Sequence, residues 1–301
     1  MTGTSPGVDG IGLAPGIEPG GRFDQWSPAR VRYVVCDVDG TLVGPAVNAS
    51  AEVVAAIARA RIADLRVGYA TGRMRDAVAT LHTQLDAPGP HILHNGAEVR
   101  ADGRTVAAWT LTHAEVDALL AFDQERDDCY LEVYTSSGYL ASSMDERARA
   151  HWDILGAQPR GVIRTGSDLG DDPVLKATFA AFTPAAVGGI LERLATLDLE
   201  TGAAGSPLTP GLSFINATRR GTDKGAALRR AAQHLDLDVR EVAAIGDAAN
   251  DLSMLAVAGT AIAMGQAPPE VRAAAHLVVP DVDAHGVAIA LDALGSGALV
   301  P

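Results

Sequence analysis

Two aspartates follow the first strongly apolar stretch of the chain, and a single residue separates them. The stretch "VRYVVCDVDGTLVGP" covers residues 31–45 and places Asp37 and Asp39 just after a short run that predicts a strand. Like charges at close range repel, so an apolar strand that ends in paired carboxylates needs a reason. A hard cation such as Mg²⁺ removes this repulsion and prefers oxygen ligands. The pair therefore indicates a site that combines carboxylates with a cation.

Polar residues also follow other predicted strands. The segment "ATGR" follows a predicted strand at 65–70, "HNGA" follows one at 91–93, and "GDAAND" follows one at 242–245. In an open parallel sheet, ligands bind beyond the carboxyl ends of the strands. Lys224, early in a predicted helix, is expected at the same place. The residues expected to gather there are Thr41, Thr71, Gly72, Arg73, Asn95, Lys224, Asp247, Asn250 and Asp251.

The residue types suit phosphoryl transfer. The rigid position of Asp37 at a strand end suits a nucleophile that forms an aspartyl-phosphate. Asp39, in the loop, is placed to give a proton to the leaving oxygen and later to take one from water. The carboxylates of Asp37, Asp39, Asp247 and Asp251 would hold Mg²⁺, and Lys224 and Thr71 would hold phosphate oxygens.

The elements needed to position these residues alternate along the chain. Strands at 31–36, 65–70 and 91–93 alternate with helices at 50–61 and 73–85, and Ser50 is a plausible N-cap. The same alternation returns over 223–294. Together the two blocks predict a doubly wound, Rossmann-like parallel-sheet α/β core. We expect this discontinuous core to cover 29–96 and 217–301, with an inserted α+β cap domain at 97–216.

The composition limits the possible partners and location. A net charge of −13 argues against a nucleic-acid partner, and no apolar run is long enough to span a membrane. Two distant cysteines, Cys36 and Cys129, favour a reducing, cytoplasmic location. Residues 1–28 are rich in Gly and Pro and predict a flexible tail, with packing through Phe23 and Trp26 as the alternative. The sequence does not indicate the oligomeric state.

Four motifs occur in an order that resembles the haloacid dehalogenase-like (HAD) superfamily of phosphohydrolases. They are "DVDGT" (37–41), "ATGR" (70–73), "DKG" (223–225) and "GDAAND" (246–251). Three more segments resemble its Cof-type branch with an inserted type IIB cap: "HNGA" (94–97), "AIAMGQAP" (261–268) and "HLVVPDVDAHGVAIAL" (276–291). The sequence departs from that branch at Gln266, where Asn is common, and near His276, where an acidic residue is common.

The resemblance implies a role for each motif position. It makes Asp37 the nucleophile and Asp39 the general acid and base. It places Thr71 and Lys224 on the phosphoryl group. It assigns Mg²⁺ to the Asp37 side chain, the Asp39 backbone carbonyl and Asp247, with Asp251 and Asn250 supporting the metal and Lys224.

The sequence thus predicts a Mg²⁺-dependent phosphatase of small phosphorylated metabolites, such as sugar phosphate-like monoesters. A sugar phosphomutase would use the same two aspartates, and a non-catalytic sensor of phosphorylated ligands is the alternative from another class. Several single residues stay open. Arg73 either orients the substrate or the loop that carries Asp37 and Asp39, or is an exposed helix residue. Asn95–Gly96 is either a bare turn or a substrate contact, and His91 and His94 are interpreted as structural or solvent-exposed. The pair Arg219 and Arg220 is interpreted as a solvated basic pair.

Overall fold

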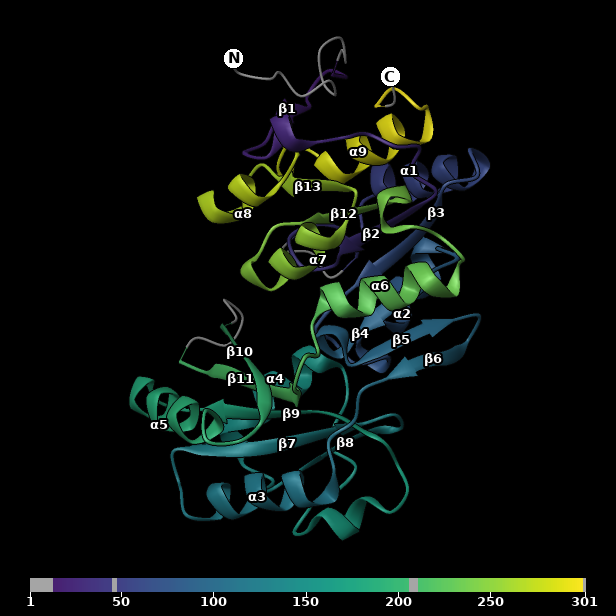
Figure 1. The fold of residues 1–301 in the computed structure, drawn as a ribbon. Helices are drawn as coiled ribbons and strands as arrows, with labels where there is room; N and C mark the ends of the chain where they lie inside the picture. Colours follow the sequence, from purple (N-terminus) through teal and green to yellow (C-terminus); the bar gives the residue numbers. More distant parts are fainter. Residues whose placement is uncertain (1–12, 45–47, 206–210, 300–301) are drawn as a thin grey trace. The chain divides into compact units, whose positions relative to one another are not determined.

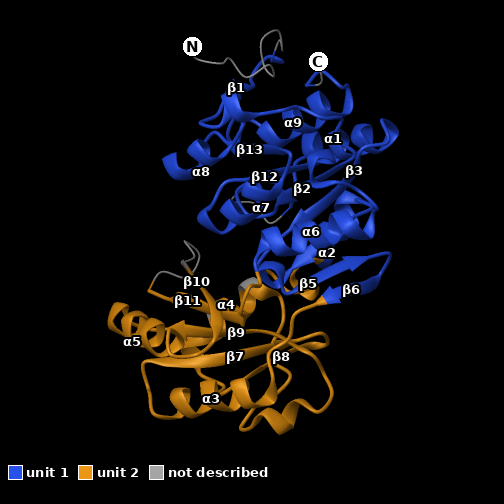
Figure 2. Ribbon diagram, viewed as in Figure 1, with its two compact units in different colours: residues 1–72, 79–107, 223–301 blue, residues 73–78, 108–222 orange. Residues whose placement is uncertain are grey.

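The computed structural model describes residues 13–44, 48–205 and 211–299 (Figure 1). The chain divides into two compact units, coloured separately in Figure 2. Unit 1 comprises Met1–Gly72, Ala79–Ala107 and Asp223–Pro301, and unit 2 comprises Arg73–Val78 and Ala108–Thr222. Among the described residues, no helix combines the length and apolar character that a membrane crossing requires.

Unit 1 is built on a nine-stranded sheet with the order β1-β14-β13-β12-β2-β3-β4-β5-β6. The six strands from β14 to β4 in this order pair in parallel, and antiparallel pairs join β1 to β14 and β5 to β4. The bounds are β1 Glu18–Pro19, β2 Tyr33–Asp37, β3 Arg66–Ala70, β4 His91–Leu93, β5 Glu98–Ala101, β6 Arg104–Ala108, β12 Val242–Gly246, β13 Thr260–Met264 and β14 Leu277–Val279.

The helices of unit 1 follow the predicted alternation with the strands. Their bounds are α1 Ala51–Ile62, α2 Ala79–Leu85, α6 Lys224–His234, α7 Leu252–Val257, α8 Pro269–Ala274 and α9 Gly286–Gly295. The Ser50 hydroxyl caps α1 by accepting a hydrogen bond from the Val53 N–H at 3.3 Å, as predicted. The helix predicted over 73–85 is shorter, because α2 begins only at Ala79 after a short 3₁₀ turn.

The parallel register brings the predicted strand ends to one edge of the sheet. Asp37 pairs with Ala70 of β3, and Cys36 pairs with Ile245 of β12. The strand β2 therefore lies between the strands that precede "TGR" and "GDAAND". This arrangement confirms the doubly wound α/β core, and Cys36 is buried within it.

Residues 13–28 differ from the predicted flexible tail. The strand β1 pairs with β14, and Trp26 is buried, with its indole N–H donating to the Thr260 hydroxyl at 3.2 Å. The Trp26 ring also stacks on His276. The sequence-based prediction rested on the Gly and Pro content of this segment. In the structure, burial of a large aromatic ring fixes the segment on the sheet. Residues 1–12 lie outside the described part of the chain.

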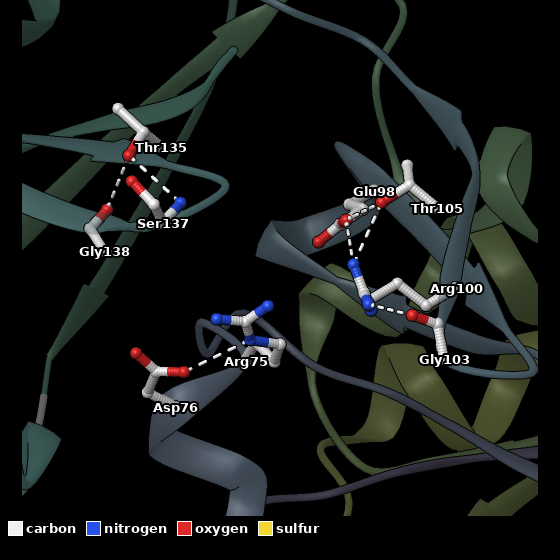
Figure 3. A network of polar contacts seen from close by, with 9 residues as sticks. All are labelled: Arg75, Asp76, Glu98, Arg100, Gly103, Thr105, Thr135, Ser137 and Gly138. Atoms are coloured by element: carbon white, nitrogen blue, oxygen red, sulfur yellow. Dashed lines mark hydrogen bonds and ion pairs between the residues drawn. The ribbon is translucent and has the colours of Figure 1, made fainter. Parts of the chain in front are cut away.

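The hairpin of β5 and β6 belongs to the sheet of unit 1, although the sequence placed residues 97–108 in the insert. An Asp102–Gly103 turn with positive φ at both residues joins the two strands, which is typical of tight hairpins. The Arg100 guanidinium ties the hairpin together by donating to Glu98 and Thr105 at 3.0 Å each and to the Gly103 carbonyl at 2.6 Å (Figure 3). The insert therefore begins after this hairpin.

Unit 2 contains an antiparallel five-stranded sheet with the order β10-β11-β9-β7-β8. One face packs on α3 and α5 around a hydrophobic core that includes Phe179, and a second cluster contains Trp152 from α4. The helix α4 was not predicted. The bounds are α3 His113–Gln124, β7 Cys129–Thr135, β8 Gly138–Ala141, α4 Arg149–Leu155, β9 Val174–Ala181, α5 Pro184–Leu194, β10 Leu199–Gly205 and β11 Ser213–Arg219.

The turn between β7 and β8 is fixed by hydroxyl groups. Thr135 donates to the Gly138 carbonyl at 3.1 Å, and its oxygen accepts from the Ser137 N–H at 3.3 Å (Figure 3). The α+β character predicted for the insert is thus present in unit 2. Unit 2 also includes residues 73–78 and 217–222, which the sequence-based division assigned to the core.

Candidate active site

Asp37 ends β2 inside the protein. Asp37 is only 5% exposed, whereas Asp39, two positions later, is exposed. The chain folds back at once, because the Gly40 N–H donates to the Val43 carbonyl at 2.8 Å and the Val43 N–H donates to the Val38 carbonyl at 2.9 Å. Gly40 has a φ of +88°, and a Cβ there would overlap the Asp247 carboxylate. This turn requires glycine and holds the two predicted catalytic aspartates in different environments.

Lys224 joins two of the predicted carboxylates. It is the first residue of α6, whose N-cap Asp223 accepts from the Ala226 N–H at 2.7 Å. The buried Lys224 ammonium donates to Asp37 Oδ1 and, at 2.6 Å, to Asp251 Oδ1. A buried ammonium needs such partners, because an unpaired charge in the interior is strongly destabilising.

The helix α6 reaches this position by close packing on α7. The Gly225 N–H donates to the Ser253 hydroxyl at 3.1 Å, and a Cβ at Gly225 would overlap the Ser253 carbonyl oxygen. The absence of a side chain at Gly225 thus lets the first turn of α6 approach α7. Ser253 was not predicted to belong to the site. Its only sequence signal is its position two residues after Asp251.

The loop after β12 holds Asp251 in a fixed orientation. Asp251 Oδ2 accepts from the backbone N–H groups of Asp247 and Ala248, at 3.0 Å each, and its other oxygen accepts from Lys224. Gly246 allows this turn, because a Cβ there would lie 2.6 Å from atoms of Asp251. Both oxygens of Asp251 therefore already have partners, whereas Asp247 is only partly buried.

Three acidic side chains converge closely enough to hold a metal ion. One carboxylate oxygen from each of Asp37, Asp247 and Asp251 lies within 4.8 Å of the others. Burial raises the pKa of Asp37 to about 8, against the opposing effect of Lys224, and the neighbouring carboxylates add to the rise. Burial, followed by repulsion from Asp251, raises the pKa of Asp247 to about 6. The set is a group of oxygen donors of the kind that Mg²⁺ uses.

Two polar side chains connect the loops around Asp247. The Thr41 hydroxyl donates to Asp247 Oδ1 at 3.3 Å. The Gln266 amide donates to the Gly40 carbonyl at 2.5 Å and to Asp247 Oδ2 at 3.4 Å, and its oxygen accepts from the Val282 N–H at 3.1 Å. The sequence analysis noted Gln266 only as a departure from a family pattern. Its position just after β13 is the signal that would have placed it in the site.

The remaining predicted residues differ in how the structure places them. Thr71 is buried directly after β3, and Gly72 follows it in the same unit. Asn250 is exposed, and within the described part of the chain its side chain makes no hydrogen bond to the site. Arg73 falls in unit 2, so its relation to Asp37 stays a prediction.

The two histidines near β4 are buried, which agrees with the structural rather than the solvent-exposed interpretation. His91 Nδ1 accepts from the Tyr69 N–H at 3.4 Å, and its ring stacks on Tyr69 with a centroid distance of 4.0 Å. Arg220 pairs with Asp198 and Arg219 donates to the Thr110 carbonyl at 3.4 Å, and both arginines are exposed.

The fold and the site place the protein in the class of doubly wound α/β proteins with an acidic, lysine-containing site at the carboxyl edge of the sheet. Residues 34–291 match the family model of the haloacid dehalogenase-like hydrolases, and the chain belongs to this family. The resemblance inferred from its motifs is thereby confirmed.

Relatives and solved structures agree with this assignment. The chain is 30% identical to a 5-amino-6-(5-phospho-D-ribitylamino)uracil phosphatase of Bacillus subtilis over 286 residues, which cover 89% of this chain and 99% of the relative. It is 25% identical to an HMP-PP phosphatase of Escherichia coli, over 80% of this chain and 87% of the relative. A solved HAD subclass IIB sugar phosphatase has the same fold, with a TM-score of 0.74 at 23% identity, covering 88% of this chain and 99% of the other.

Proposed function

We propose that this protein is a Mg²⁺-dependent phosphatase that hydrolyses small phosphorylated metabolites through an aspartyl-phosphate on Asp37. The observation that carries the proposal is the buried contact of Lys224 with Asp37 and Asp251, next to Asp247. The three carboxylates and one ammonium leave two negative charges when all are ionised, which is the charge that one divalent cation neutralises. Family membership and the named phosphatase relatives support the same activity.

The donor set fits Mg²⁺, and the contacts suggest how the residues divide the work. Asp37 and Asp247 would hold the ion directly. Asp251 would orient Lys224 and the 247–248 backbone, because both of its oxygens already have partners. Bound Mg²⁺ would supply positive charge beside the phosphoryl oxygens.

In the first step, an oxygen of Asp37 attacks phosphorus, and the bond between phosphorus and the ester oxygen breaks. Asp39 gives its proton to that leaving oxygen, so an alcohol departs and an acyl phosphate remains on Asp37. Ionised Asp37 is required for attack. Burial disfavours that form, and the adjacent Lys224 ammonium opposes the effect of burial. The ammonium also stabilises the charge that develops on the phosphoryl oxygens.

In the second step, water attacks the phosphorus of the acyl phosphate, and Asp39 takes a proton from it. The bond between phosphorus and the Asp37 oxygen breaks, which releases inorganic phosphate and restores both aspartates. The different environments of the two residues suit these roles, since Asp37 is fixed and buried and Asp39 is exposed in the loop.

The proposed substrates are sugar phosphate-like monoesters, in keeping with the phosphorylated metabolites named for the relatives. A role for unit 2 in substrate selection is part of the proposal, and a cytoplasmic location remains a prediction from the sequence. A small phosphorylated metabolite is the proposed partner, and the acidic composition is the argument against nucleic acid.

The variant Asp37→Asn tests the nucleophile, because an amide of the same shape cannot form the acyl phosphate. We expect Mg²⁺-dependent hydrolysis of p-nitrophenyl phosphate to fall by at least about 10³-fold, with an unchanged circular dichroism spectrum. Asp102→Asn is the matched control, since Asp102 is exposed in the β5–β6 turn and Asn tolerates its positive φ. Substantial turnover by purified Asp37→Asn would contradict the proposed role.

A further inference from the structure

The loop after β4 contains an uncommon backbone path. His94, Asn95 and Gly96 have φ values of +52°, +57° and +106° in succession. Residues with side chains rarely adopt this left-handed region, and Asn is among those that tolerate it best. Such outliers persist only when their surroundings hold them in place, and they gather at functional sites.

The surroundings that hold this loop belong to the active site. The Asn95 N–H donates to the Thr71 carbonyl at 3.0 Å. Gly96 packs directly on the start of α6, because a Cβ there would overlap the Asp223 carbonyl. The loop 94–96 thus lies against the segment that carries Thr71 and against the residue that precedes Lys224.

The Asn95 side chain has an acceptor that the protein itself leaves unused. Its amide oxygen is buried, and within the described residues it has no hydrogen-bond partner. The oxygen lies beside Gly72, where a Cβ would come within 2.8 Å of it. A bare turn does not explain this arrangement, because Asn in turns commonly bonds its own backbone, and a buried acceptor without a partner is destabilising.

We infer that Asn95 accepts a hydrogen bond from a hydroxyl or amino group on the leaving-group part of the substrate. The inference rests on the proposed phosphatase function and narrows its substrate class. β2, β3 and β4 are neighbours in the sheet, so the loop after β4 lies two strand spacings, about 10 Å, from the strand of Asp37. At this distance from Asp37, Asn95 is too far away to contact the phosphoryl group itself. A leaving group with a chain of roughly five or six atoms, such as a polyol or sugar, can carry a donor as far as Asn95.

The test compares substrates with and without a donor. Asn95→Gly keeps the left-handed backbone and removes the amide, and Asn95→Asp keeps both the backbone preference and an acceptor. The substrates are p-nitrophenyl phosphate, whose leaving group has no further donor, and a panel of polyol and sugar monophosphates. Wild-type turnover of p-nitrophenyl phosphate with Mg²⁺ checks the proposed function separately.

We expect Asn95→Gly to lower kcat/KM for the best hydroxyl-bearing substrate about tenfold, while kcat/KM for p-nitrophenyl phosphate changes less than about twofold. Asn95→Asp should restore most of the kcat/KM that Asn95→Gly loses on the hydroxyl-bearing substrate. Equal losses on both substrates would overturn the inference, because they would mean that Asn95 acts only through the loop. A wild-type enzyme that hydrolyses p-nitrophenyl phosphate but no member of the panel would overturn it as well, and would leave the proposed phosphatase activity standing.

Discussion

At the scale of single residues, the site depends on charges that are buried together. Lys224 is 1% exposed and has two carboxylate partners, of which Asp251 also accepts hydrogen bonds from two backbone N–H groups. Removing one member would leave another charge in the interior without its partner, which is strongly destabilising. These charged side chains therefore hold one another in position as a group. The effects of substitutions among them on stability and activity will not be additive.

His91 predicts a pH dependence of folding stability that is separate from the catalytic reaction. Burial, and next to it the charge of His82, lowers the pKa of His91 to about 3 from its ordinary 6.5. Below pH 6.5 the unfolded chain binds a proton that the folded protein does not bind, so stability is complete above that pH and falls as the pH drops toward 3.

Measuring the free energy of unfolding by denaturant from pH 7 to pH 4.5 checks this prediction. The wild type should lose up to about 1.4 kcal/mol per pH unit through His91. His91→Asn, which keeps an acceptor for the Tyr69 N–H, should have a shallower slope. Identical slopes for both proteins would show that His91 titrates normally in the folded state.

At the scale of elements, glycines let segments that are distant in sequence approach one another. Gly40 brings the turn after β2 onto Asp247, and Gly225 brings α6 onto α7. In both cases the space that a Cβ would need is filled by another part of the site. These close contacts bring the carboxylates, which belong to separate elements, together around Lys224.

Gly225→Ala should therefore reduce activity without touching a reactive group. The new Cβ would push the first turn of α6 away from Ser253 and displace Lys224, and we expect kcat/KM to fall at least about tenfold. Gly188→Ala is the matched control, because Gly188 lies in α5 with nothing within 4 Å of a Cβ. That control should keep its activity and gain up to about 1 kcal/mol of stability. Equal activity of the two variants would contradict the role of the α6–α7 contact.

The sequence predicted most strands because their apolar runs are short and end in polar turns. It predicted the convergence of Asp37, Lys224, Asp247 and Asp251, since parallel strands end at one edge. It ranked the packing of Trp26 only as the alternative to a flexible tail, because a Gly- and Pro-rich segment carries no periodicity that indicates a tertiary anchor. It missed the bridging role of Gln266, since a contact between two loops depends on the path of each loop and leaves no pattern in either segment.

At the scale of the whole molecule, the chain has a net charge of −13, and part of that charge is concentrated in the site. Cation binding to the folded site should stabilise the protein as a whole, because the unfolded chain lacks the converged carboxylates. The expected gain is about 2.7 kcal/mol when free Mg²⁺ is 100-fold above its Kd.

Thermal unfolding with and without Mg²⁺ measures this gain. The wild type should show a higher Tm with Mg²⁺, and Asp247→Asn should lose most of that shift because it removes a proposed ligand. Asp236→Asn is the control, since Asp236 is exposed and its positive φ suits Asn. A Tm shift of equal size in all three proteins would place the cation elsewhere.

The central claim is that a phosphoryl group is transferred to Asp37. The most direct measurement quenches the enzyme in acid during turnover of a phosphate monoester with Mg²⁺, reduces acyl phosphates with borohydride and sequences the peptides by mass spectrometry. The account predicts that residue 37 alone is converted to homoserine, and that Asp37→Asn gives no conversion. Conversion at another carboxylate, or none at all during rapid turnover, would contradict it.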